Sequence, residues 1–259
     1  MQYALVNGVR TEPSKALKGI CTGCNGDVIA KCGDIKVHHW AHKSIKDCDP
    51  WAEPETPWHR EWKDKFPPEF REVVFRDENT KEIHRADVHT PRGITLEFQN
   101  SPISIQEIKS RDQFYPKLIW VVNAAEFDVQ SAGHIPNPTS PLLNDFEFIC
   151  DKNGMGSHLT FYRKRGRNLD SKSLYMYETV GIEHYDLREV KTMLEESGGR
   201  YTAFTWKYAS LAWLTTKSPV FLDFGYPDLY WLRTRPQDIN PLRYLQVVKK
   251  IDFIHKYSQ

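Results

Sequence analysis

The chain has no long hydrophobic run. Of its 259 residues, 40% are hydrophobic, but no window approaches the ~20 apolar residues that a membrane-spanning helix needs. The first residues, Met-Gln-Tyr-Ala-Leu-Val, have neither the basic region nor the apolar stretch of a signal peptide. With a mean hydropathy of −0.59, we expect a globular, cytoplasmic protein with no membrane partner. Its length predicts about two domains.

Cysteine and net charge are also low. Five cysteines, an odd number, argue against the disulfide framework of a secreted protein. The net charge is only +1, so any field that attracts DNA must come from local patches. The densest basic patch is Arg163-Lys-Arg-Gly-Arg167, and a solvated loop explains it equally well.

Three of the cysteines gather with histidines near the N-terminus. Paired thiols with an intervening glycine form a good zinc knuckle, and a segment this short has little core of its own. The alternative is a histidine-rich loop with free thiols in a reducing cell. A closed set of four ligands predicts a structural zinc ion, whereas an open position would predict a catalytic one. The preferred set is Cys21, Cys24 and Cys48 with His39 or His42, and Cys32 and His38 are weaker candidates.

A predicted hairpin carries two acidic side chains. Side chains alternate across a strand, so Glu97 and Gln99 share one face while Leu96 and Phe98 share the other. The turn sequence Thr90-Pro-Arg-Gly93 favours a three-residue loop with glycine at the left-handed position.

That loop sets Asp87 opposite Glu97 and Val88 opposite Leu96. A slip of one residue would bury the carboxylates and expose the aliphatic side chains, so the hydrophobic pattern selects this register. Two like charges on one sheet face repel each other, and a divalent cation relieves the repulsion. The alternative is an ordinary hairpin with its acidic residues on a solvated side.

Helices are predicted before and after this hairpin. Thr56 and Pro57 are a typical N-cap and first helical residue. Trp58, Trp62 and Phe66 form a core-facing stripe, and spacing alone predicts that His59 and Lys63 lie on a solvated flank.

Ser104 with Glu107 predicts a second helix start, and Pro116 ends that helix near Tyr115. A further strand is expected at Glu72–Arg76, and the apolar run Lys117–Val122 is typical of a strand in a parallel sheet. The order of elements is therefore helix, three strands, helix, strand, which predicts an α/β or α+β fold around one sheet.

Over roughly residues 20–123 the chain resembles the CoiA-like competence proteins, a branch of the PD-(D/E)XK nuclease superfamily. The resemblance is carried by a set of motifs at consistent spacing. These are Glu55-Thr56, His59 and Lys63; Arg85-Ala-Asp87; Glu97, Gln99 and Ser101; and Glu107, Arg111 and Tyr115.

The resemblance implies a restriction-endonuclease-like αβββαβ core, with an N-terminal zinc knuckle and a C-terminal α+β extension. The expected segments are 1–50, 51–130 and 145–259, with a linker at Ser131–Leu143 because proline and glycine accumulate there. In the C-terminal half we expect a strand at Pro219–Phe224 and a helix over Pro241–Tyr257. Its aromatic residues stack on unpaired bases or, more commonly, fill the core; they are Trp206, Trp213, Tyr230 and Trp231.

The function implied is a metal-dependent DNA endonuclease of recombination, DNA uptake or defence, with Asp87 and Glu97 holding Mg²⁺ or Mn²⁺. By resemblance, Glu55 completes the metal shell and His59 positions water or phosphate. Gln99 stands where the superfamily has lysine, so the missing charge falls to Lys63, to Lys109 or to a second metal.

The expected substrate contacts are Lys63, Ser101 and Arg111. The expected partners are DNA, including branched or single-stranded DNA, and a second copy of the chain. The alternative function is a non-catalytic nucleic-acid-binding protein that retains the nuclease scaffold.

Overall fold

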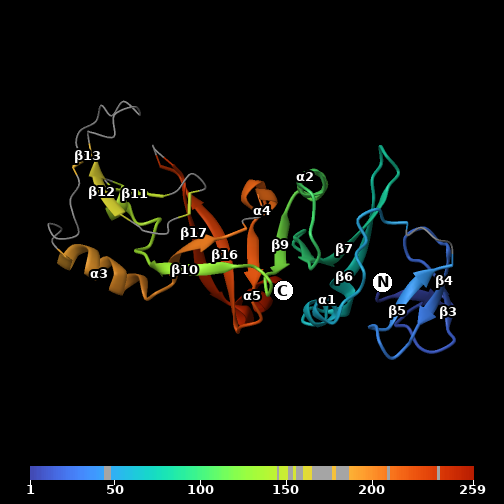
Figure 1. Ribbon diagram of the computed structural model, residues 1–259. Helices are drawn as coiled ribbons and strands as arrows, with labels where there is room; N and C mark the ends of the chain where they lie inside the picture. The colour runs from blue at the N-terminus through green and yellow to red at the C-terminus, as the bar shows by residue number, and fades with distance from the viewer. Residues whose placement is uncertain are drawn as a thin grey trace. The chain divides into compact units, whose positions relative to one another are not determined.

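The structure is a computed structural model that describes residues 1–43, 48–144, 146–150, 154–155, 160–164, 177–178, 187–208, 211–237 and 240–259 (Figure 1). The chain forms two compact units. Unit 1 comprises Met1–Asn123, Leu211–Ser218 and Ile251–Gln259, and unit 2 comprises Ala124–Ser210 and Pro219–Lys250. This grouping differs from the three segments expected from the sequence, because two late stretches of the chain join unit 1.

Unit 1 begins with a five-stranded sheet in the order β2-β1-β3-β4-β5. All of its pairs are antiparallel. A small core of Ala4, Cys21, Val28 and Trp40 stabilises it. The strands are β1 (Ala4–Val6), β2 (Val9–Thr11), β3 (Lys18–Ile20), β4 (Asp27–Lys31) and β5 (His39–His42).

The rest of unit 1 shows the predicted order of helix, three strands, helix and strand. The strands are ordered β6-β7-β8-β9, and β8 pairs with β9 in parallel, as the apolar run at the last strand predicts. The elements are α1 (Pro57–Lys63), η1 (Pro68–Phe70), β6 (Arg71–Arg76), β7 (Ile83–His89), β8 (Thr95–Gln99), α2 (Ile105–Phe114) and β9 (Leu118–Asn123), followed late in the chain by α4 (Leu211–Thr215) and α5 (Lys250–Tyr257).

The β7–β8 hairpin has the predicted register. Val88 pairs with Leu96, the Gly93 N–H donates to the Thr90 carbonyl at 2.9 Å, and Gly93 has a φ of +72°. A glycine in this left-handed conformation closes the three-residue loop without steric cost. Asp87 and Glu97 are therefore the next facing positions along the hairpin.

The alternative, an ordinary hairpin with its acidic residues on a solvated side, is wrong. All five residues of β8 are buried, and Glu97 and Gln99 are only 5% and 2% exposed. The segment between the cysteine cluster and α1 lies over this face, since Glu53 contacts Gln99 and the Trp51 carbonyl accepts from Arg111 at 2.9 Å.

Helix α1 has the predicted start but not the predicted flank. The Thr56 hydroxyl accepts from the His59 N–H, and Pro57 is the first helical residue. Trp62 stacks on Phe98 with 5.4 Å between ring centroids. His59 and Lys63 are 5% and 2% exposed, so the side predicted to be solvated is buried. This side of α1 is surrounded by carboxylates, which the helical spacing does not reveal.

Unit 2 contains strands in the order β10-β14-β17-β16-β15 and a small sheet in the order β11-β12-β13. Trp206 of this unit is 6% exposed, and Tyr230 and Trp231 are partly buried. The elements are β10 (Val129–His134), η2 (Pro141–Leu143), β11 (Phe146–Ile149), β12 (Thr160–Lys164), β13 (Tyr177–Glu178), α3 (Leu187–Ser197), β14 (Tyr201–Trp206), β15 (Val220–Asp223), β16 (Asp228–Arg235) and β17 (Leu242–Lys249).

Two expectations for this half are wrong. The proposed linker overlaps the second half of β10, which pairs with β14 through an irregularity between Ser131 and Gly133. The proposed helix over 241–257 is helical only in α5, because β17 pairs with β16 along its whole length. The basic patch at 163–167 lies largely outside the described residues.

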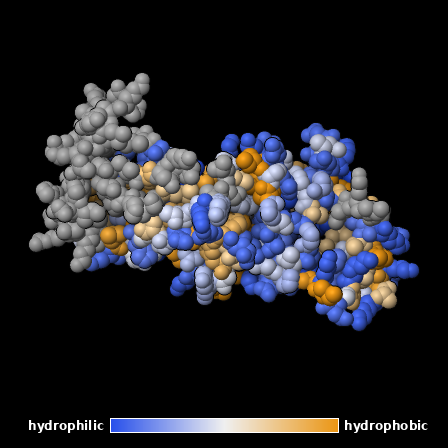
Figure 2. Space-filling view, viewed as in Figure 1, coloured by the Kyte–Doolittle hydropathy of each residue, from blue (hydrophilic) through white to orange (hydrophobic). Residues whose placement is uncertain are grey.

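No helix of the described residues is long and apolar enough to cross a membrane. Figure 2 shows hydrophobic side chains in small separate groups among hydrophilic ones on the visible face. Exposed apolar residues include Ile35 and Ile251, at 98% and 68%. Scattered exposure of this kind is ordinary on a protein surface.

Candidate active site and metal centre

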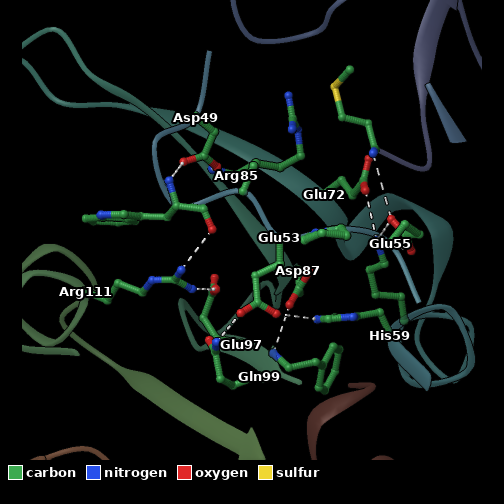
Figure 3. A pocket seen from close by; sticks show the side chains of 16 residues that line it. Asp49, Glu53, Glu55, His59, Glu72, Arg85, Asp87, Glu97, Gln99 and Arg111 are labelled. Atoms are coloured by element: carbon green, nitrogen blue, oxygen red, sulfur yellow. Dashed lines mark hydrogen bonds and ion pairs between the residues drawn. The ribbon is translucent and has the colours of Figure 1, made fainter. Parts of the chain in front are cut away.

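The hairpin carboxylates line a polar pocket of unit 1 (Figure 3). The cavity is about 70 Å³, which holds a few water molecules or a hydrated ion. Its polar lining comes from the segment before α1, from helices α1 and α2 and from strands β6 to β8. The charged or amide-bearing lining residues are Asp49, Glu53, Glu55, His59, Lys63, Glu72, Arg85, Asp87, Glu97, Gln99 and Arg111.

Glu97 is held from one side only. Its Oε2 accepts from Arg111 Nη1 at 2.9 Å, while its Oε1 is buried with no hydrogen-bond partner among the described residues. Arg111 is 3% exposed and also binds Glu107 and the Trp51 carbonyl. The guanidinium is therefore committed to protein groups.

Burial disfavours the charged forms of Asp87 and Glu97 in the absence of a cation. Burial raises the pKa of Asp87, and the charges of Lys63 and His59 offset this only in part. Burial raises the pKa of Glu97 well above 4.5, and the neighbouring Asp87 charge adds to the shift. A divalent cation between them would reverse both effects.

His59 and Gln99 converge on Glu53, which the sequence did not single out. His59 Nε2 lies 3.4 Å from Glu53 Oε2, and the Gln99 amide donates to Glu53 Oε1. The second proton of that amide goes to the Ser101 carbonyl at 3.0 Å. Burial opposes protonation of His59, but the carboxylates of Glu53 and Asp87 outweigh it and raise its pKa.

Lys63 lies between two carboxylates. Its Nζ is 2.8 Å from Glu55 Oε1 and 2.9 Å from Glu72 Oε1. Burial opposes the charged form of Lys63, but these two neighbours outweigh it and raise its pKa. Glu72 has a φ of +48° and accepts the backbone N–H groups of Gln2 and Tyr3 at 2.7 and 3.1 Å. Lys63 thus neutralises a buried acidic pair.

The structure brings most of the predicted site residues to one pocket. Some of their neighbours there differ from those expected from the sequence. Asp87, Glu97, Gln99, His59, Lys63, Glu55 and Arg111 line it, whereas Ser101 touches it only through its carbonyl. Lys109 is exposed on α2 and is not among the lining residues. Sequence reasoning missed Asp49, Glu53 and Glu72, and it named Arg85 only as part of the Arg85-Ala-Asp87 motif. Only their acidic character marks the three missed residues, and many other residues share it.

We expect Glu72 to make stability depend on acid. Burial alone would raise the pKa of Glu72, but the Lys63 ammonium outweighs it and holds that pKa well below 4.5. As the pH drops below about 5, Glu72 takes up a proton in the unfolded chain but stays ionised in the folded chain. The free energy of unfolding therefore falls. Urea titrations from pH 6 to 3 should show a smaller fall in the free energy of unfolding for Glu72→Gln than for the parent protein. An identical fall in both proteins would contradict this assignment.

A second cluster lies between strands β3 and β5. The ligand atoms of Cys21, Cys24, His42 and Cys48 all lie within 4.8 Å of one another, and no other group of three or more donors was found among the described residues. The pocket carboxylates are therefore spread more widely. His39 instead contacts the Val37 carbonyl through Nδ1 at 2.8 Å, so His42 is the histidine of the cluster. Cys32 and His38 lie outside it.

The geometry of this cluster fits a structural zinc ion. Cys21 Sγ lies 3.7 Å from Cys48 Sγ, close to the ~3.8 Å edge of a tetrahedron with Zn–S bonds near 2.3 Å. The Gly23 and Gly26 N–H groups donate to the sulfurs of Cys21 and Cys24 at 3.3 and 3.4 Å. A hydrogen bond from Cys48 lowers the pKa of Cys21 to about 4, which favours the thiolate that zinc binds. Four ligands close the site and leave no open catalytic position.

We expect Cys24→Ser to lose bound zinc and to lower the melting temperature by on the order of 10 °C, because zinc binding contributes directly to folding. Cys32→Ser is the matched control, since Cys32 lies outside the cluster. Metal analysis and calorimetry on both variants measure these effects. A parent protein that carries no zinc, with equal melting temperatures in all three proteins, would rule out the structural ion.

Comparison with known proteins gives a match to a family model. Residues 12–50 match the family model of the competence protein CoiA, N-terminal domain. The matched segment contains all four residues of the Cys/His cluster and supports a CoiA-like competence protein. It ends before α1 and contains only Asp49 among the charged side chains that line the acidic pocket. No curated protein and no solved structure matches the chain.

Proposed function

We propose that the acidic pocket is the active site of a metal-dependent DNA endonuclease that hydrolyses phosphodiester bonds. The observation that carries this proposal is the pair of Asp87 and Glu97, adjacent across a hairpin, with one buried oxygen of Glu97 lacking a partner. A buried carboxylate oxygen without a donor is costly, and a hard divalent cation satisfies it.

Asp87 and Glu97 would hold Mg²⁺ or Mn²⁺, which when bound polarises a phosphoryl oxygen and lowers the pKa of a bound water. The small cavity has room for a hydrated ion but not for a nucleotide, so the scissile phosphate would approach from the mouth of the pocket. Both amide protons of Gln99 are used, which leaves its carbonyl oxygen to orient a water.

Two cations of this pocket that could replace the positive charge of the lysine in related nucleases are already paired with carboxylates. Lys63 is held between Glu55 and Glu72, and Arg111 is held by Glu97 and Glu107. We therefore assign both cations to balancing the pocket charge rather than to binding DNA. The metal site would then have to stabilise the negative charge that develops during the reaction.

DNA as the substrate is supported by the competence-family match at residues 12–50 and by the motifs shared with that family. One observation favours the alternative, a non-catalytic nucleic-acid-binding protein. The Arg111 guanidinium already neutralises part of Glu97, at 2.9 Å, and a pocket balanced in this way is stable without a metal.

The test is to incubate end-labelled linear, branched and single-stranded DNA with the zinc-loaded protein and Mg²⁺, Mn²⁺, Ca²⁺ or no added metal. We expect cutting with Mg²⁺ or Mn²⁺ only. DNA binding without cutting under every condition would favour the alternative.

A further inference from the structure

Glu53 occupies the place in the pocket that the family pattern gives to Glu55. Its carboxylate contacts Gln99 through one oxygen and His59 through the other, and His59 and Gln99 flank Asp87 and Glu97 (Figure 3). Glu53 is partly buried, and its Oε2 also lies 3.4 Å from the Asn100 N–H. It therefore reaches the C-terminal end of β8, two residues after Glu97.

Glu55 faces a different group. Its Oε1 lies 2.8 Å from Lys63 Nζ and 3.3 Å from Arg60 Nε, and its Oε2 accepts from Lys63 Nζ at 2.9 Å. Moving it to a metal ion would leave Lys63 with one partner inside a buried site, which is costly. Glu53 has no such partner among fully charged side chains, since its contacts are an amide, a backbone N–H and a histidine.

Given the proposed nuclease site, on which this inference rests, we infer that Glu53 is the third carboxylate ligand of the divalent cation, beside Asp87 and Glu97. The second observation concerns Glu97, which is 5% exposed. Its Oε1 is buried and has no hydrogen-bond partner among the described residues. A divalent cation that several carboxylates share would satisfy this oxygen.

The segment that carries Glu53 is fixed on both sides of it. Asp49 accepts the Arg85 N–H at 2.8 Å and the Trp51 N–H at 2.9 Å. Trp51 stacks on His84 with ring centroids 3.4 Å apart, and its carbonyl accepts from Arg111. Because Asp49 directly follows the cluster residue Cys48, the Cys/His cluster anchors this segment at its start. Glu53 is thus a positioned group.

The three carboxylates do not form one of the groups of donors that lie within 4.8 Å of one another among the described residues. A bound cation would draw them together, and water would complete its shell. Glutamine at position 53 keeps the size of the side chain and an oxygen that accepts from Gln99, so Glu53→Gln should remove the charge without disturbing the segment.

The test is Mn²⁺ binding to the zinc-loaded protein, measured by calorimetry and by the loss of free Mn²⁺ signal in electron paramagnetic resonance. Three proteins are compared: the parent, Glu53→Gln and Glu55→Gln. Glu55 is two residues away in the same segment, which makes it the matched control. Circular dichroism and melting temperature confirm that all three are folded.

We expect Glu53→Gln to weaken Mn²⁺ binding by about tenfold or more, and Glu55→Gln by less than about threefold. Glu53→Asp should recover part of the loss. Unchanged binding in Glu53→Gln, or a larger loss in Glu55→Gln, would overturn the role of Glu53 and leave the nuclease proposal standing. A parent protein that binds no Mn²⁺ would overturn both.

Discussion

Asp87→Asn is expected to lower DNA cleavage by at least about a thousandfold while the protein stays folded. The variant removes one anionic ligand from the proposed cation site, and the metal-held water and phosphate lose their alignment with it. Asparagine keeps an oxygen that can accept the Phe98 N–H, which Asp87 now accepts at 2.9 Å. The backbone of the hairpin is therefore not disturbed.

The same variant should not lose stability in metal-free buffer. Burial raises the pKa of Asp87, so its charged form is unfavourable without a cation and its removal is neutral or stabilising. Melting temperatures and cleavage rates are measured together, with Asp34→Asn as a control because Asp34 is exposed and outside the pocket. Cleavage by Asp87→Asn at the parent rate would refute the metal site.

Lys63→Met is expected to destabilise the protein by about 3–5 kcal/mol, because it leaves two buried carboxylates without their cation. Lys63 is 2% exposed and lies 2.8 and 2.9 Å from Glu55 and Glu72. Methionine fills much of the same space, so the effect reports charge rather than a cavity. Equilibrium unfolding in urea measures the loss.

The double variant Lys63→Met/Glu72→Gln separates this explanation from a general packing defect. Removing one of the two orphaned charges should restore part of the lost stability, so the double variant should be more stable than Lys63→Met alone. A double variant that is less stable than Lys63→Met by the full cost of Glu72→Gln would show that the two residues are not coupled.

Short sequence patterns were enough to predict the hairpin register and the helix starts, because residues close in the chain determine these features. The turn at Thr90–Gly93 and the alternation of β8 determine the hairpin register, and caps at Thr56 and Ser104 set the starts of α1 and α2. These signals act over a few residues, so one sequence is enough to read them.

The burial of the pocket side chains and their contact partners depend on segments far apart in the chain. The sequence around α1 contains no sign that Glu72, nine residues after Lys63, would make its flank a buried ion pair. Nor does it distinguish Glu53 from Glu55, which stand on either side of Pro54. The long-range contact between Glu53 and Gln99 decides between them. The strand β17 escaped prediction for the same reason, since pairing with β16 overrides its helical spacing.

The central claim is that one pocket binds the catalytic cation of a nuclease. Its most direct test is anomalous diffraction from crystals of the zinc-loaded protein soaked in Mn²⁺ with a short DNA. We predict a manganese peak about 2.2 Å from oxygens of Asp87 and Glu97, with a DNA phosphate beside it. A map whose metal peaks lie only at Cys21, Cys24, His42 and Cys48 would contradict the account.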